Sequence, residues 1–123
     1  MDEIFELAHD QAHVWLLALT VPRGDDRRLL DPEEQSRLAR FVFQASRDEF
    51  LASHALTRRI LAGYERVSPE ALVFERNAYG RPELSGSRCG LRFSLSHSGG
   101  RGALAVTRAG AVGVDVERSE RQL

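Results

Sequence analysis

Residues 93–117 read FSLSHSGGRGALAVTRAGAVGVDVE, and this stretch decides the fold class. Phe93 and Leu95 alternate with serines, which is the period of a half-buried strand. Two more apolar stretches, at 102–107 and 111–117, flank the sequence RAGA, a composition that suits a hairpin connection. The carboxyl-terminal third of the chain therefore predicts antiparallel strands.

The middle of the chain carries two helix signals between residues 32 and 64. The stretch DPEE at 31–34 supplies an N-cap, a proline at the first helical position and an acid at the third. Ser46 and Glu49 repeat the capping signature before a second apolar pattern. We expect His54, inside the second helix, to be packed or solvated. The apolar positions that follow the first cap at helical spacing are Leu38, Phe41, Val42 and Ala45.

The remaining segments predict short elements. The run HVWLLALTV at 13–21 is continuously apolar, as expected of a strand covered on both faces with Trp15 in the core. Residues 68–72 predict a short capped turn, residues 73–75 a brief strand and residues 77–87 an ordered loop. The predicted fold class is α+β, with helices packed on a small antiparallel sheet in one domain.

Composition narrows the class of protein. The 123 residues carry a formal net charge of -1, with arginines interleaved among acids, which disfavours nucleic-acid binding. No apolar run is long enough for a membrane span or signal peptide, and the single cysteine, Cys89, cannot form an internal disulfide. We therefore expect a soluble, cytoplasmic protein. Every basic residue is arginine, whose planar fork can hold two phosphate oxygens at once.

The last predicted strand carries a pair of acids. Asp115 and Glu117 alternate with valines, so they share one face with their β-carbons about 7 Å apart. A hard divalent cation can bridge this span, and Mg²⁺ usually completes its shell with waters and substrate phosphates. The pair suggests a metal-phosphate site, and a solvated edge strand is the alternative.

A second group of polar residues surrounds a predicted glycine-rich turn. His97 lies at the end of a strand, with Ser94 and Ser96 before it and two glycines after it. Hydroxyls, an imidazole and free backbone amides can hold phosphate oxygens. A hydrolase with Ser96 as nucleophile is the alternative, but the G-x-S-x-G elbow and its following helix are missing.

A third candidate is the loop sequence YGRP at 79–82. Gly80 and Pro82 fix the loop from which Arg81 projects, and Arg76 lies five residues earlier. Arg81 can bind phosphate, and a surface ion pair with a neighbouring glutamate is the alternative.

The order YGRP, FSLSHS, VGVDVE resembles the successive signatures of surfactin-type 4'-phosphopantetheinyl transferases, and the resemblance covers nearly the whole chain. Such enzymes move the phosphopantetheine arm of coenzyme A onto a serine of an acyl or peptidyl carrier protein, with magnesium. The resemblance implies that residues 1–123 form the amino-terminal half of a pseudo-dimer. Its partners would be coenzyme A, the carrier protein, and a carboxyl-terminal half or a second copy.

The resemblance also implies roles for individual residues. Asp115 and Glu117 would be catalytic ligands of Mg²⁺. Glu34 is acidic where some relatives carry a base, and Arg81 replaces a lysine. The family's Lys-Glu segment does not occur in these residues, so we expect little activity from this half alone. A non-catalytic, self-associating module that binds coenzyme A or a carrier protein is the alternative. The implied coenzyme A contacts are Arg37, Arg76, Arg81, Ser94, Ser96 and His97.

Overall fold

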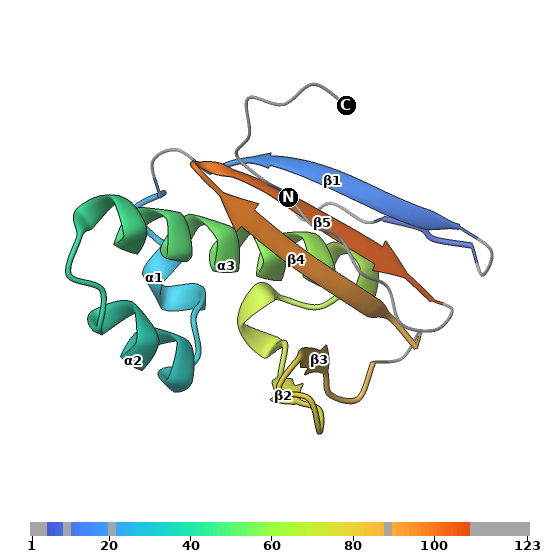
Figure 1. The fold of residues 1–123 in the computed structure, drawn as a ribbon. Coiled ribbons are helices and arrows are strands. Elements are labelled where there is room, and N and C mark those ends of the chain that lie inside the picture. Colours follow the sequence, from blue (N-terminus) through green and yellow to red (C-terminus); the bar gives the residue numbers. More distant parts are fainter. Residues whose placement is uncertain (1–4, 9–10, 20–21, 88–89, 109–123) are drawn as a thin grey trace.

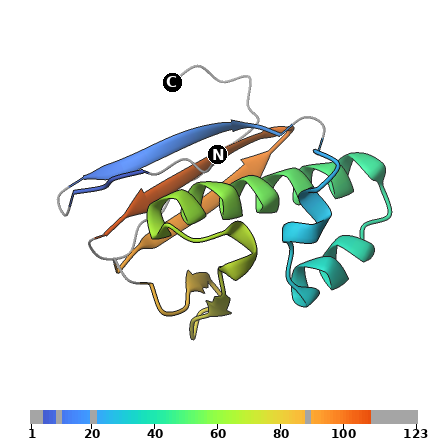
Figure 2. The same cartoon turned by 180° about the vertical axis from the view of Figure 1, so that it is seen from behind.

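The central element is a three-stranded antiparallel sheet in the order β1 (Ala12–Ala18), β5 (Arg101–Thr107), β4 (Arg92–Ser98). The long helix α3 (Gln44–Glu65) lies across one face of this sheet (Figures 1 and 2). The computed structural model describes residues 5–8, 11–19, 22–87 and 90–108. The predicted fold class, α+β with helices on a small antiparallel sheet, is confirmed.

The smaller elements lie beside the sheet and its covering helix. Helices α1 (Asp26–Leu29) and α2 (Pro32–Ala39) precede α3, and the turn η1 (Pro69–Ala71) follows it. Strands β2 (Phe74–Arg76) and β3 (Pro82–Leu84) pair as a separate antiparallel hairpin. Figure 1 shows this hairpin and α2 on the same side of the molecule, below α3 and β4.

The main core lies between the sheet and α3. Leu104 of the central strand and Leu61 of the helix are fully buried there. Tyr64 closes one end, where its hydroxyl lies 2.9 Å from Trp15 Nε1 and 2.6 Å from His13 Nδ1. Burying a leucine contributes about 1.5–3 kcal/mol, so this layer holds α3 against the sheet.

The predicted start of α2 is confirmed. The Asp31 side chain accepts a hydrogen bond from Glu34 N at 2.7 Å, and the Glu34 carboxylate accepts one from Asp31 N at 3.0 Å. This capping box satisfies two groups that a helix terminus would otherwise leave unpaired, and Pro32 begins the helix.

The predicted boundary between the two helices is wrong. Helix α2 stops at Ala39, and α3 begins at Gln44 with Phe43, not Ser46, as its N-cap. Phe41 leaves the helix so that its ring can pack on Phe50, 5.2 Å between centroids, while Val42 is 86% exposed. The chain therefore turns where sequence spacing alone continues the helix.

Two other expectations about the elements are corrected, and a third lies outside the described residues. The strand at 13–21 is not covered on both faces, because Val14 and Leu16 are 59% and 83% exposed while Leu17 points inward. The loop at 77–87 contains β3, and α1 was not expected. The hairpin predicted across residues 108–117 lies outside the described residues.

Candidate functional site

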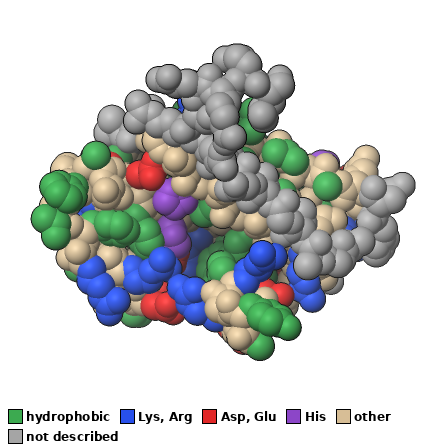
Figure 3. Space-filling model, in the orientation of Figure 1, with side chains coloured by type: hydrophobic (Ala, Val, Ile, Leu, Met, Phe, Trp, Pro, Cys, Tyr) green, Lys and Arg blue, Asp and Glu red, His purple; other side chains and the backbone are tan. Residues whose placement is uncertain are grey.

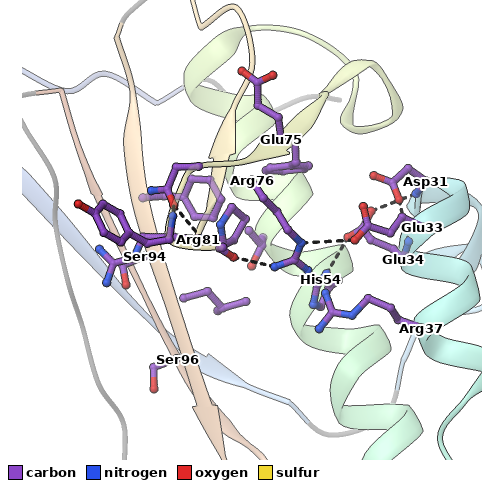
Figure 4. A pocket seen from close by; sticks show the side chains of 18 of the residues that line it. Asp31, Glu33, Glu34, Arg37, His54, Glu75, Arg76, Arg81, Ser94 and Ser96 are labelled. Carbon is purple, nitrogen blue, oxygen red and sulfur yellow. Dashed lines mark hydrogen bonds and ion pairs between the residues drawn. The ribbon is translucent and has the colours of Figure 1, made fainter.

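A cavity of about 920 Å³ opens between α2, α3, the β2–β3 hairpin and strand β4 (Figures 3 and 4). Its volume suits a small-molecule ligand of nucleotide size. Figure 3 shows histidine side chains in the hollow and arginines along its rim. The charged and polar residues that the sequence singled out and that line it are Glu34, Arg37, His54, Arg76, Arg81, Ser94, Ser96 and His97.

A buried arginine organises the wall of the cavity. Arg58 of α3 is 1% exposed, and its Nε and Nη2 donate to Glu34 Oε1 at 2.9 and 2.6 Å. Nη2 also donates to Asp31 Oδ2 at 3.1 Å, while Nη1 donates to the carbonyls of Pro69 and Leu72. The Arg58 guanidinium thus joins the start of α2 to the turn after α3.

The carboxylate of Glu34 receives hydrogen bonds from several sides. Burial raises its pKa, but the hydrogen bonds from His54, Asp31 N and Arg58 outweigh burial and lower the pKa from 4.5 to about 2. Glu34 is therefore ionised at neutral pH and already paired. The carboxylate of Glu34 therefore joins α2 to α3 through Arg58 and His54.

His54 was expected to be packed or solvated, and it lies in the cavity wall. Its Nδ1 lies 2.7 Å from Glu34 Oε2, and its ring stacks on Phe50 with 4.0 Å between centroids. The side chain keeps 20% exposure, and it lines the cavity. A sequence signal existed, because His54 and Arg58 are four residues apart and so share one helix face.

Arg37 and Arg81 have guanidinium groups without an acidic partner among the described residues. The Arg37 guanidinium lies over the Phe50 ring, 5.2 Å from its centroid, which is a cation–π contact. Arg81 is exposed, and its hydrogen bonds within the described residues come from its backbone, whose N–H donates to Asn77 Oδ1 at 3.0 Å and whose carbonyl accepts from Asn77 N at 2.9 Å. Across the described residues neither side chain forms an ion pair, so the predicted pairing of Arg81 with a neighbouring glutamate is not observed.

Arg76 links the two sides of the cavity mouth. Its Nη1 donates to Gly80 O at 2.8 Å, and its Nε lies 3.5 Å from Glu33 Oε1 of α2 (Figure 4). Both groups are largely exposed, so the ion pair is worth little to stability. The Arg76 side chain also lines the cavity between α2 and the hairpin.

Strand β4 brings its polar residues to the cavity from two faces. His97 points toward α3, where its Nδ1 lies 3.0 Å from Glu49 Oε2. Ser94 and Ser96 occupy alternate positions, so they lie on the opposite face of the strand. All three border the cavity because β4 ends the sheet of described strands. Ser96 and His97 therefore diverge, which opposes the hydrolase alternative.

The turn after β4 is fixed by a carboxylate. Glu49 Oε1 accepts a hydrogen bond from Gly100 N at 2.5 Å. Burial raises the pKa of Glu49, but the hydrogen bonds from Gly100 and His97 prevail and the net pKa is lowered. This glutamate, predicted as part of a helix cap, instead holds the glycine turn and orients the His97 ring.

The predicted metal pair, Asp115 and Glu117, lies outside the described residues. Within residues 5–8, 11–19, 22–87 and 90–108, no three His, Cys, Asp or Glu side chains are grouped to hold a metal ion. In the same part of the chain, no helix is long and apolar enough to cross a membrane.

Fold and cavity together define an α+β domain with a cavity lined by arginines, acids, serines and histidines. Residues 25–109 match the model of the family described as "4'-phosphopantetheinyl transferase, N-terminal". The chain therefore belongs to the 4'-phosphopantetheinyl transferase family.

Individual relatives agree with this assignment. The chain is 34% identical over 116 residues to the 4'-phosphopantetheinyl transferase HetI of Nostoc sp., covering 90% of this chain and 49% of HetI. It is 33% identical over 93 residues to a phosphopantetheinyl transferase of Thraustochytrium sp., covering 75% of this chain and 32% of the relative. It is 28% identical over 97 residues to the L-aminoadipate-semialdehyde dehydrogenase-phosphopantetheinyl transferase of Xenopus laevis, covering 76% of this chain and 32% of the relative. The chain thus spans half or less of the length of these relatives.

Proposed function

We propose that this chain takes part in transferring the 4'-phosphopantetheine group from coenzyme A to a serine of an acyl or peptidyl carrier protein. The observation that carries the proposal is the charge pattern of the cavity in a member of this family. Asp31 and Glu34 are engaged by Arg58, whereas Arg37 and Arg81 keep their guanidinium groups unpaired within the described residues. Unpaired guanidinium groups in a cavity are suited to phosphate.

The cavity residues would divide the coenzyme between them. Arg37 and Arg81 would bind its phosphate groups from opposite walls, and Arg76 would assist at the mouth. Ser94, Ser96 and His97 would line the nucleotide along β4. The surfactin-type subclass is proposed on the order of the three sequence motifs, and a cytoplasmic location is proposed on composition.

Magnesium belongs to this proposal through Asp115 and Glu117. Carboxylate oxygens are the ligands that Mg²⁺ prefers, and two of them leave positions for waters and substrate phosphate. When bound there, the ion would stabilise charge that develops on the leaving phosphate. Arg37, Arg76 and Arg81 would bind and orient the coenzyme.

We further propose that residues 1–123 form an amino-terminal half-domain that works against a carboxyl-terminal half or a second copy. The matched family model is itself the amino-terminal domain. Val14 and Leu16 present exposed apolar side chains on the outer face of β1, which supports an additional packing partner. A purely binding, self-associating module is the alternative to an enzyme half.

Calorimetry of the chain with coenzyme A and Mg²⁺ tests the proposal. We expect saturable binding that Arg37→Ala weakens by roughly tenfold or more, because a charged hydrogen bond to phosphate is lost. Arg40→Ala is the matched control, since it removes the same charge from the end of α2 without changing the cavity lining. Asp115→Ala should remove the Mg²⁺ dependence of binding.

Transfer itself is measured by the mass gain of an apo-carrier protein. We expect little transfer by this chain alone and restored transfer when the family's carboxyl-terminal half is added. Binding of coenzyme A without transfer under both conditions would favour the binding module. Absence of binding in the wild-type chain would contradict the proposed function.

A further inference from the structure

His54 is held in a defined orientation by residues that the proposed function does not use. Its Nδ1 meets Glu34 Oε2 at 2.7 Å, and Glu34 is fixed in turn by Arg58 and by Asp31 N. Stacking on Phe50 fixes the plane of the imidazole. Figure 4 shows His54 reaching from α3 toward α2 across the cavity wall. Because the hydrogen bond fixes Nδ1 of His54 and the stacking fixes the plane of its ring, the position of the second ring nitrogen, Nε2, is fixed as well.

The hydrogen bonds of Glu34 decide which nitrogen of His54 carries a proton. Glu34 Oε1 already accepts from Arg58 Nε, Arg58 Nη2 and Asp31 N, which is the pattern of an ionised carboxylate. An ionised carboxylate has no proton to donate, so His54 Nδ1 must be the donor in their contact. Nε2 is then an acceptor in the neutral ring and a donor only in the imidazolium.

The remaining nitrogen is available on the cavity side. Nε2 of His54 makes no hydrogen bond within the described residues, and it is not among their buried unpaired side-chain atoms. Arg37 packs over the same Phe50 ring and lines the same cavity as His54. An anion bound in this cavity favours the protonated form of an imidazole that it contacts.

We propose that His54 is a further ligand-binding residue, whose imidazolium Nε2 donates to a phosphate oxygen beside Arg37, and that phosphate binding is accompanied by proton uptake at His54. This inference rests on the proposed function for the identity of the ligand. Glu34 and Arg58 act through His54 as positioning residues. The proton comes from solvent and forms the Nε2–H bond of the imidazolium, and no bond between heavy atoms is formed or broken.

Charged and titratable groups from several elements face the cavity that His54 lines. Glu34 accepts the hydrogen bond of His54 Nδ1, and Arg37 packs on the same Phe50 ring. His97 is oriented by Glu49 and is a second imidazole at the site. The other charged groups of the lining are Asp31, Glu33, Glu75, Arg76 and Arg81.

Calorimetry in two buffers of different ionisation enthalpy measures the protons taken up per coenzyme A bound. At about pH 7.5, where an ordinary histidine is mainly neutral, we expect the wild-type chain to take up a substantial fraction of one proton. His54→Asn places an amide nitrogen where Nδ1 was, so the Glu34 contact is kept and Nε2 is lost. We expect this variant to lose most of the proton uptake and roughly 10- to 100-fold in affinity.

Two further variants separate binding from folding. His54→Gln carries an amide nitrogen to the position of Nε2, so part of the affinity should return without proton uptake. His13→Asn is the matched control, because His13 has its Nδ1 bonded to Tyr64 and does not line the cavity. It should leave both quantities unchanged. Equal affinity and equal proton uptake in the wild-type chain and His54→Asn would overturn the inference.

The two proposals fail separately. If the wild-type chain does not bind coenzyme A, the proposed function fails, and nitrogen NMR of the histidines with inorganic pyrophosphate tests His54 by itself. A pyrophosphate-dependent shift of the His54 Nε2 signal toward the imidazolium value would support the inference. An unchanged signal would refute it.

Discussion

Arg58 supports the cavity wall through Glu34, whereas Arg81 lines the cavity itself, and the two arginines have opposite surroundings. Every donor nitrogen of Arg58 is bonded to protein, to the carboxylates of Glu34 and Asp31 and to two carbonyls of the turn after α3. The Arg81 side chain makes no hydrogen bond or ion pair within the described residues. The same residue type therefore supports the cavity wall at one position and leaves donors for a ligand at the other.

The difference separates stability from recognition. A guanidinium whose five donors are used by the protein has none left for phosphate. An exposed guanidinium without a partner adds little to folding, but it can form a bidentate bond with a ligand. Substitutions of Arg58 should therefore mainly lower the free energy of unfolding. Substitutions of Arg81 should mainly lower the affinity for the ligand.

The largest expected effect comes from Arg58→Ala. The change leaves Glu34 buried without its cation and removes the bonds to Pro69 and Leu72. Removing one partner of a buried ion pair costs about 3–5 kcal/mol, so we expect the free energy of unfolding to fall by that amount. Urea denaturation followed by circular dichroism measures it.

Arg58→Lys is the informative control. Lysine keeps the positive charge but cannot span Glu34, Asp31 and two carbonyls with one ammonium group. We expect an intermediate loss of stability. A loss below about 1 kcal/mol for Arg58→Ala would show that the cluster does not hold α2 to α3.

The second effect is a dependence of stability on pH through Glu34. Its pKa in the folded protein is about 2, below the ordinary 4.5, so its contribution is fully present above about pH 4.5 and is lost as the pH falls toward 2. A difference of this size corresponds to a contribution on the order of 3 kcal/mol. Unfolding measured between about pH 6 and pH 2 should show this loss.

Glu34→Gln isolates that contribution. The variant has no carboxyl group at this position, so its stability should fall less steeply over the same pH range. Glu49, whose pKa is also lowered, is present in both proteins and cancels in the comparison. Parallel pH profiles of the two proteins would contradict the assignment.

The fold was predictable where the signals are local. The capping box at Asp31 and Glu34 and the alternation of Phe93 and Leu95 both depend on residues a few positions apart, and both elements formed. Strand β3 was missed because it forms only by pairing with β2. The exposure of Leu16 was missed because a continuous apolar run does not reveal whether one face of the sheet stays open.

The sequence predicted several residues that line the cavity, but it did not predict the contacts between the residues that support the cavity wall. Sequence motifs named Arg81 and His97, the family resemblance added Arg37, and all three line one cavity. The Glu34–His54 and Glu34–Arg58 contacts join residues 20 and 24 positions apart on different helices. No local pattern links them, so their pairing follows only from how α2 packs on α3.

The smallest expected effect on stability comes from Arg81→Ala. Because the side chain is exposed and unpaired within the described residues, we expect the free energy of unfolding to change by less than about 0.5 kcal/mol. Binding should respond differently, with coenzyme A weakened about tenfold and more than dephospho-coenzyme A, since a guanidinium–phosphate bond is lost. Calorimetry with both ligands measures this, and Arg40→Ala again supplies the charge-matched control. Equal losses for the two ligands would remove the 3'-phosphate from the proposed contact of Arg81 and leave a general attraction to anions.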